Sequence, residues 1–282
     1  MMLPSAFEIK NPKTLSDALE ILQDGKDQIQ ILAGGTDVLP RLKNGFIHPK
    51  MIMDLTMLKS ELSQINVENG ILKIGAFVTH TQICQSTVVN NTVPVLAQAC
   101  QTIGCRQIRN RGTIGGNIVN ASPAGDTLPV LLALDAVVQI ISRAKTRELP
   151  LDDLLLGPGK VSLGSDEMIS EIRIPVKSSI MKGMFKKLGT RNALNIAIAS
   201  AAVVLDSCGN KRIAYGALAP RPIRAREVEE ALNQNQNLLW EDVKTIIFRT
   251  VHPISDVRAS ADYRKEMAAN LTYMCLADLG VL

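Results

Sequence analysis

The sequence predicts an α+β protein, on three observations. A short apolar run at residues 29–32 is followed by a helical pattern and by a second apolar run at residues 51–54, which together indicate a β-α-β unit. Asn69 and Gly70 then interrupt an alternating apolar segment, and this pair favours a tight antiparallel hairpin because both residues tolerate positive φ. Beyond residue 184, three β-rich segments precede three helical patterns, which predicts an antiparallel sheet with helices packed on it.

The composition limits the functional classes. With 282 residues, of which 46% are hydrophobic, the chain can bury a core as one large domain or two to three smaller ones. Aromatic residues make up only 3% and the net charge of +4 is scattered, which argues against binding of nucleic acid. The longest apolar stretch, residues 128–141, is interrupted by Asp135 and Gln139, and the start of the chain lacks the apolar segment of a signal peptide. We therefore expect no membrane span and a cytoplasmic location.

Cysteine and histidine usage argues against a metal centre. The five cysteines include no C-x-x-C pair, and none of the three histidines stands at metal-ligand spacing. An odd number of cysteines without such pairs fits free thiols in a reducing cytoplasm. We expect this chain to hold no metal by itself.

Helix and strand signals at the start of the chain are local and clear. A helix is predicted from Leu15 to Gly25, with Thr14 as its N-cap and glycine as its stop signal. The strand at residues 29–32 then leads through a glycine-rich turn into a further helical turn at residues 37–43.

The later elements follow in the same way. In the middle of the chain we expect helices and strands at residues 93–103, 126–134, 136–142 and 167–175. The last of these alternates apolar and polar residues and ends at Pro175, which is typical of an edge strand. A domain boundary is expected near residues 175–179. Beyond it we expect three strands, with a turn at Gly209, and three helices, at residues 184–187, 196–206, 211–217, 225–232, 240–251 and 261–276.

Two glycine-rich turns stand out, Gly34-Gly35 and Gly115-Gly116. Taken singly, each is explained by the freedom of glycine in a tight turn. Neither fits the dinucleotide fingerprint or the P-loop. Taken together they indicate an anion site, because both expose backbone N–H groups where a side chain would block an anion. We interpret them as the two sides of one nucleotide site.

Polar side chains near these turns can supplement the backbone donors. Thr36 belongs to the first turn, and Thr113 and Asn117 belong to the second. Asp126 follows, and its carboxylate either accepts a hydrogen bond from a ribose hydroxyl or caps the helix that it precedes. The residues alone leave both roles open.

Three arginines lie between the helix at residues 93–103 and the second turn: Arg106, Arg109 and Arg111. They can pair with a diphosphate, with acidic residues of another subunit, or with solvent. For a short run of charges the solvated face is the usual case.

At these turns the sequence resembles a known family, the FAD-binding medium subunits of molybdenum hydroxylases of the xanthine, nicotinate and CO dehydrogenase type. The resemblance covers essentially the whole chain. Its motifs are LAGGTD at residues 32–37, RNRGTIGGN at 109–117, SPAGD at 122–126, EMISEIRIP at 167–175, FK at 185–186, APRPIRA at 219–225 and ADYRK at 261–265.

The resemblance implies a flavin-binding fold of the vanillyl-alcohol-oxidase/CO-dehydrogenase (PCMH) type. It implies an N-terminal FAD subdomain at residues 1–55, a second FAD subdomain at 56–176 and a C-terminal CO-dehydrogenase-flavoprotein-like domain at 177–282. Lys186 is implied to approach the isoalloxazine ring, although an amphipathic strand lysine with a solvated head is the alternative. The implied FAD-binding residues are Ile31, Leu32, Ala33, Gly34, Gly35, Thr36, Asp37, Val38, Thr113, Gly115, Gly116, Asn117, Asn120, Asp126, Ile169 and Lys186.

The resemblance also implies a division of labour among subunits. A molybdopterin subunit oxidises the substrate, [2Fe-2S] clusters on a small subunit carry the electrons, and FAD on this chain passes them to NAD or another acceptor. Because the chemistry belongs to the flavin, we nominate no general acid or base. The alternatives are a self-sufficient FAD-dependent reductase on the same fold and a non-enzymatic assembly protein.

Overall fold

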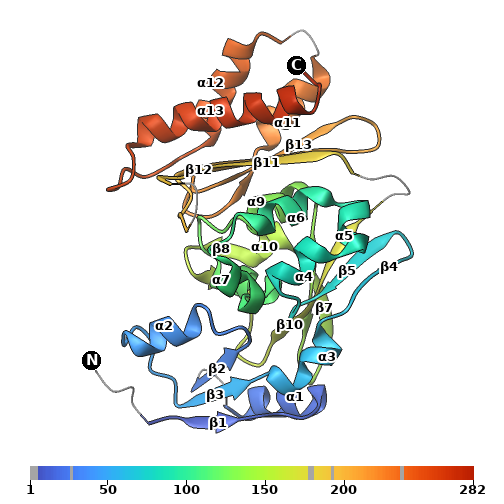
Figure 1. The fold of residues 1–282 in the computed structure, drawn as a ribbon, viewed down its shortest axis with the longest axis vertical. Helices are drawn as coiled ribbons and strands as arrows, with labels where there is room; N and C mark the ends of the chain where they lie inside the picture. Colours follow the sequence, from blue (N-terminus) through green and yellow to red (C-terminus); the bar gives the residue numbers. More distant parts are fainter. Residues whose placement is uncertain (1–5, 26–27, 177–180, 192–193, 236–237) are drawn as a thin grey trace.

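The computed structural model describes residues 6–25, 28–176, 181–191, 194–235 and 238–282. Three larger sheets follow one another along the long axis of the molecule, from the N-terminal sheet at one end to the C-terminal sheet and its helices at the other (Figure 1). This mixture of helices and sheets confirms the α+β class.

The N-terminal sheet is parallel, with the strand order β1-β3-β2. Its elements are β1 (Glu8–Lys10), α1 (Leu15–Gly25), β2 (Ile29–Leu32), α2 (Val38–Lys43) and β3 (Met51–Asp54). The predicted helices and strands are confirmed here, and Thr14 and Asp17 cap α1 by exchanging side-chain-to-backbone hydrogen bonds, each of 3.1 Å. Sequence analysis missed β1, because three residues are too short for an alternation to show.

The central sheet is antiparallel, with the order β4-β5-β10-β6-β7. Its strands are β4 (Ile65–Glu68), β5 (Ile71–Gly75), β6 (Val137–Ile141), β7 (Thr146–Pro150) and β10 (Met168–Pro175). The hairpin turn is confirmed, with Asn69 at φ 51° and Gly70 at φ 74°. The edge-strand prediction is wrong, because β10 lies in the middle and pairs with both β5 and β6. Pro175 is tolerated because it is the last residue of the strand.

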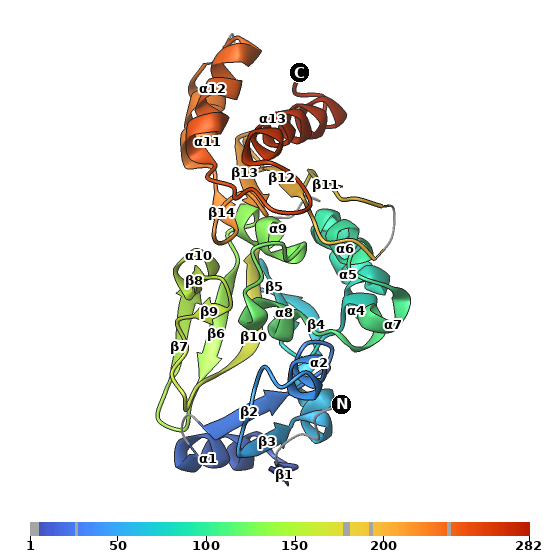
Figure 2. The same ribbon diagram turned by 90° about the vertical axis from the view of Figure 1, so that its left-hand side faces the viewer.

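Short helices pack on one face of the central sheet (Figure 2). The predicted helices are confirmed as α6 (Pro94–Gln101) and α9 (Thr127–Ala133). Several short elements were missed, the helices because they complete no more than two turns and the two strands because two or three residues show no alternation. They are α3 (Lys59–Leu62), α4 (His80–Gln85), α5 (Thr87–Thr92), α7 (Arg106–Arg111), α8 (Ile114–Asn120), α10 (Leu151–Leu154), β8 (Leu155–Gly157) and β9 (Lys160–Val161).

The C-terminal sheet is antiparallel and lies between two helical layers (Figure 2). Its strands and the helices after it are β11 (Gly183–Leu188), β12 (Ala199–Leu205), β13 (Lys211–Gly216), β14 (Ile223–Arg224), α11 (Arg226–Gln234), α12 (Trp240–Thr250) and α13 (Ala261–Asp278). Apart from β14, all were predicted. Residues 177–180, where the domain boundary was expected, lie outside the described residues.

The two faces of the C-terminal sheet belong to different cores. Phe185, Ala202 and Ala214 face α6 and α9 and extend the core of the central sheet. Val203 and Tyr215 face α11, α12 and α13 and form a second core with them. This alternation along β12 and β13 fixes the C-terminal sheet onto the middle of the molecule.

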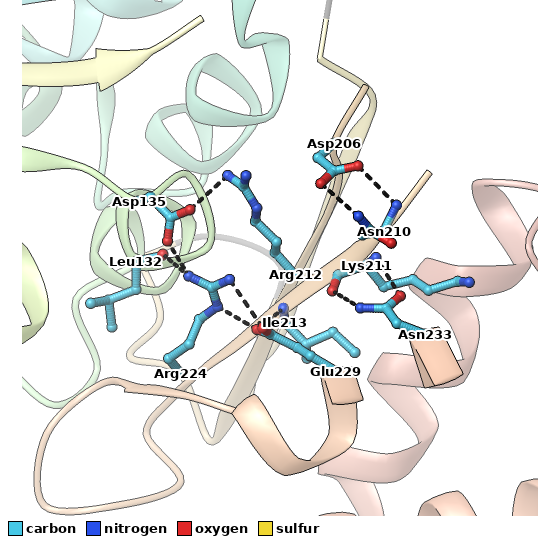
Figure 3. A network of polar contacts seen from close by, with 10 residues as sticks. All are labelled: Leu132, Asp135, Asp206, Asn210, Lys211, Arg212, Ile213, Arg224, Glu229 and Asn233. Carbon is cyan, nitrogen blue, oxygen red and sulfur yellow. Dashed lines mark hydrogen bonds and ion pairs between the residues drawn. The ribbon is translucent and has the colours of Figure 1, made fainter. Parts of the chain in front are cut away.

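Arg224 links the C-terminal sheet to the end of α9 (Figure 3). Its guanidinium donates to the Leu132 carbonyl oxygen at 3.1 Å, pairs with the Asp135 carboxylate, and donates to Glu229 Oε2 at 3.0 Å. Arg212 also reaches Asp135, at 2.8 Å. Because the Arg224 side chain is buried, these contacts occur where solvent screening is weak.

We expect Arg224→Ala to lower the free energy of unfolding by about 3 kcal/mol or more, because it leaves the buried Glu229 carboxylate without its cation. Arg226→Ala is the matched control, since Arg226 is 65% exposed and its nitrogen lies 3.5 Å from Asp152, so its loss costs about 1 kcal/mol or less. Urea unfolding of both variants measures the difference. Equal losses would contradict the role given to Arg224.

Candidate functional site

A cleft of about 500 Å³ lies between the N-terminal sheet and the middle of the molecule. This volume is within the range of small-molecule and cofactor sites. One wall is formed by Ile31, in β2, and by residues 33–38, which follow this strand. The first turns of α8 form the other wall. The two glycine-rich segments that the sequence singled out therefore meet across one cleft.

The segment at residues 34–38 presents a row of free backbone donors. Among the described residues, no hydrogen bond uses the N–H groups of residues 34–38. Gly35 has a φ of 77°, a left-handed conformation that glycine adopts without strain. Successive free N–H groups in a concave turn are a site for an anion such as a diphosphate.

Gly34 allows the first segment to touch the second. A Cβ atom on Gly34 would lie 1.9 Å from the Arg111 carbonyl oxygen, so only glycine fits. Arg111 Nε also points at the Gly34 carbonyl oxygen, at 3.4 Å. The two walls of the cleft are therefore in backbone contact.

The second glycine segment is not the exposed turn that we expected. Gly115 and Gly116 belong to the first turn of α8, and Thr113 is its N-cap. The N–H groups of residues 114–117 are already bonded, to the carbonyl oxygens of Val78, Ala76 and Thr113 and to Thr113 Oγ1. This wall contributes the partial positive charge at the N-terminus of α8 and lets a ligand approach the helix backbone. Its four N–H groups are already bonded and are not free to bind an anion.

Gly115 and Gly116 have different roles. A Cβ on Gly115 would lie 2.7 Å from the Ala76 Cβ, so Gly115 is needed for packing. Gly116 is exposed and lines the cleft, and the only close neighbour of a Cβ there would be Thr113 Oγ1 at 2.9 Å. Gly116 thus keeps the cleft open.

Polar side chains of α8 lie on the same wall. Asn117 accepts a hydrogen bond from Thr127 Oγ1 at 2.5 Å, which fixes its amide group. Asn120 Nδ2 donates to Asp37 Oδ1 at 3.2 Å and so joins the two walls. Burial raises the pKa of Asp37, partly offset by Arg41. Ile169, on the floor of the cleft, lies at a register shift in β10.

Asp126 lies outside the lining of the cleft and makes no capping hydrogen bond to α9. Its Oδ2 is 2.6 Å from Lys187 Nζ and accepts from Thr102 Oγ1 at 3.0 Å. Burial raises the pKa of Asp126, and the Lys187 ammonium acts against this rise. Its other oxygen, Oδ1, is buried with no partner among the described residues. Thr102, which contacts both members of the pair, precedes Ile103, and Ile103 lines the cleft.

Lys186 does not lie at the cleft. Its ammonium pairs with Asp278 of α13 at 2.6 Å, on the far side of the C-terminal sheet. Lys187 does not line the cleft either, but it faces the middle of the molecule, where it also donates to the Thr102 carbonyl oxygen at 3.3 Å. Successive side chains of a strand point to opposite faces, which is why these neighbouring lysines have different partners.

Sequence analysis missed many residues that line the cleft, among them His80, Ile103 and Ile108. His80 is 2% exposed and its Nδ1 lies 3.6 Å from Cys100 Sγ. Burial, assisted by the charge of Arg109, lowers the pKa of His80 to about 4, so the ring is neutral at neutral pH. Only the tertiary position of His80 identifies it.

The three arginines near the second glycine-rich segment make different contacts. Arg109 donates to the Ile103 carbonyl oxygen at 2.9 Å and Arg111 points at Gly34, whereas Arg106 is exposed. None of them is among the residues that line the cleft.

In the part of the chain that the structure describes, no cluster of three or more His, Cys, Asp or Glu side chains is arranged to hold a metal ion. None of the described helices is long and apolar enough to cross a membrane.

Two family models match consecutive parts of the chain. The FAD binding domain in molybdopterin dehydrogenase matches residues 5–177, and the CO dehydrogenase flavoprotein C-terminal domain matches residues 184–279.

Full-length relatives agree with these matches. The chain is 34% identical to the glyceraldehyde dehydrogenase medium chain of Sulfolobus acidocaldarius, over 96% of this chain and 97% of the relative. It is 35% identical to the xanthine dehydrogenase FAD-binding subunit of Escherichia coli O157:H7, over 94% and 93%. Among solved structures, a chain of carbon monoxide dehydrogenase from Hydrogenophaga pseudoflava superposes with a TM-score of 0.89 at 29% identity, covering 98% of each chain.

The burial of His80 has a consequence for stability against pH. Between pH 6.5 and about 4 the unfolded chain binds a proton at this residue, whereas the folded chain does not. As the pH is lowered from 6.5 to about 4, the free energy of unfolding is therefore expected to decrease, by up to about 3 kcal/mol from this group. Urea unfolding of the wild type and of His80→Gln over the range isolates the effect, because carboxyl groups contribute to both proteins. Parallel curves would contradict the depressed pKa.

Proposed function

The chain belongs to the FAD-binding medium subunits of molybdenum hydroxylases, and on this premise we propose that its cleft binds FAD between residues 31–38 and α8. FAD is the cofactor of this family, and the chain is a subunit of an oxidoreductase. The proposal concerns which residues hold the flavin and what the chain does with it.

The free N–H groups of residues 34–38 carry the proposal. A diphosphate has oxygen atoms that accept several hydrogen bonds at once, and this segment offers several donors without partners among the described residues. The opposite wall adds the N-terminus of α8, which favours negative charge, and Gly116, which lets the ligand approach the backbone. Thr36, Thr113 and Asn117 supply further polar groups.

We place the redox-active ring of the flavin toward Ile103, next to the Asp126–Lys187 pair. The unpartnered Oδ1 atom of Asp126 is a buried acceptor in need of a donor, and a bound ligand can supply one. The ammonium of Lys187 adds a positive charge where screening by solvent is weak. Lys187 thus takes the part first given to Lys186.

The flavin supplies the redox chemistry, and the protein binds it, orients it and tunes its potential. We propose that this chain is the electron-transfer subunit of a hetero-oligomer, which receives electrons from [2Fe-2S] clusters on a small subunit after a molybdopterin subunit has oxidised the substrate. NAD or another acceptor then takes the electrons. We further propose a cytoplasmic location for this complex.

A self-sufficient reductase is the second candidate, since the cleft is large and holds a buried histidine. The neutral His80 is a weak proton donor at neutral pH, which favours the electron-transfer role. Anaerobic mixing of the isolated FAD-loaded chain with NADH tests the acceptor side: rapid bleaching of the flavin absorbance supports exchange with NAD. Reoxidation of the reduced flavin that depends on an added organic substrate, with the chain alone, would support the reductase.

Gly116 tests the position of the diphosphate. We expect Gly116→Asp to abolish FAD binding, because its carboxylate would repel the diphosphate, and Gly116→Ala to weaken binding less, because it adds bulk without charge. The measurement is an FAD titration followed by visible absorption, with the wild type saturating at one flavin per chain. Full binding of FAD by Gly116→Asp would contradict a position of the diphosphate beside Gly116.

The two lysines test the orientation of the flavin. Lys187→Met removes a cation and should make the reduction potential of the bound FAD more negative. Asp126→Asn removes a buried anion and should make this potential more positive. Lys186→Met should leave the potential unchanged, since this lysine pairs with Asp278 on the far face. Reductive titration against dyes measures all three. A shift in Lys186→Met without one in Lys187→Met would restore the original assignment.

A further inference from the structure

Cys84 and Cys100 point into the same seam between α4 and α6. Cys84 Sγ donates to the Ala97 carbonyl oxygen at 3.6 Å, and Cys100 Sγ lies 3.6 Å from His80 Nδ1. His80 is about one turn before Cys84, and Ala97 is about one turn before Cys100. These crossed contacts place the two thiols beside each other on facing helices.

The surroundings of the two thiols differ. Cys84 is partly exposed, and its pKa is lowered, most by a hydrogen bond from Cys100 and also by the positive charge of Arg109. Cys100 is fully buried, and burial raises its pKa well above the ordinary value. A thiol that is exposed and readily ionised reacts first with an oxidant, and a buried neighbour can then complete a disulfide.

We propose that Cys84 and Cys100 form a reversible redox pair, which closes to a disulfide when hydrogen peroxide reaches Cys84. The pair lies behind His80, which lines the cleft, so the disulfide would join two helices next to the cleft wall. The proposal does not depend on FAD, because it rests only on side chains of this protein.

The reaction balances in two steps. The Cys84 thiolate attacks one peroxide oxygen, the O–O bond breaks, and the leaving hydroxide takes up a proton to give water and a Cys84 sulfenic acid. Cys100 then attacks the Cys84 sulfur, and its proton passes through His80 Nδ1, which is neutral and 3.6 Å away, to the departing hydroxyl. In total, two thiols and one peroxide give one disulfide and two waters, and a thiol reductant reverses the change.

The other cysteines provide matched controls. Cys208 is the exposed thiol and Cys105 is partly exposed, so both test whether exposure alone is sufficient for oxidation. Cys275 is buried, and burial raises its pKa to about 12, which makes it unreactive.

The experiment treats the full chain, with and without added FAD, with one equivalent of hydrogen peroxide. Free thiols are counted with a thiol reagent after unfolding. Trypsin leaves Cys84, Cys100 and Cys105 on one peptide, residues 74–106, and a second cleavage after Leu96 separates Cys84 from the other two. Fragment mass spectra of the linked peptides then show whether Cys100 or Cys105 is joined to Cys84. We expect a loss of two thiols, fragments on either side of Leu96 linked through Cys84 and Cys100, and recovery with dithiothreitol.

The variants separate the two steps. Cys84→Ser should prevent the loss of thiols, and Cys100→Ala should leave a Cys84 sulfenic acid that dimedone labels. Cys105→Ser and Cys208→Ser should form the disulfide as the wild type does. A wild-type Cys84 that is oxidised to the sulfinic acid without linkage, a disulfide to Cys105, or no reaction at Cys84 in the folded chain would each overturn the proposal. Because Cys84 is partly exposed, we expect Cys84→Ser to fold, and this variant still tests the proposal if Cys100→Ala fails to fold.

Discussion

The backbone contact between Gly34 and Arg111 is the constraint on which the site depends. It sets how closely the segment after β2 approaches the joint between α7 and α8, and a single methyl group at Gly34 would collide with a carbonyl oxygen. With the contact made, the free N–H groups of residues 34–38 face the start of α8 across a cleft of about 500 Å³. The hydrogen bond from Asn120 to Asp37 holds the same two walls together from the side chains.

The third part of the molecule is held by charge as well as by packing. Arg224 and Arg212 join the C-terminal sheet to Asp135 at the end of α9 (Figure 3), and Lys187 joins it to Asp126. These pairs are partly or fully buried, so each side chain needs its partner to remain charged in the interior. One of them, Asp126–Lys187, is the pair that we propose to lie near the flavin ring, so it would both fix the domain and act on the cofactor.

The described residues form what a flavin-binding subunit needs. A medium subunit that binds a flavin needs a cradle for the cofactor, and the redox chemistry comes with the cofactor itself. In the described residues we find a row of backbone donors, glycines at close approaches and the buried Asp126–Lys187 pair, and we find no cluster of metal ligands. The Cys84–Cys100 pair stands apart from this machinery, since its chemistry uses only protein thiols.

The sequence by itself determined the elements whose signals are local. The hairpin at Asn69-Gly70, the helix after Thr14 and the C-terminal strands and helices follow from turn chemistry, capping and periodicity, and the motifs at residues 32–37 and 109–117 identified the family. Tertiary structure decided what depends on contacts between distant residues. It placed β10 at the centre of its sheet, turned Lys187 toward the middle of the molecule and Lys186 toward α13, made Gly115 and Gly116 part of a helix, and paired Asp126 with a lysine 61 residues away. Strand neighbours, the face to which a side chain points and the partner of a buried charge are all set by long-range packing, and no local pattern encodes them.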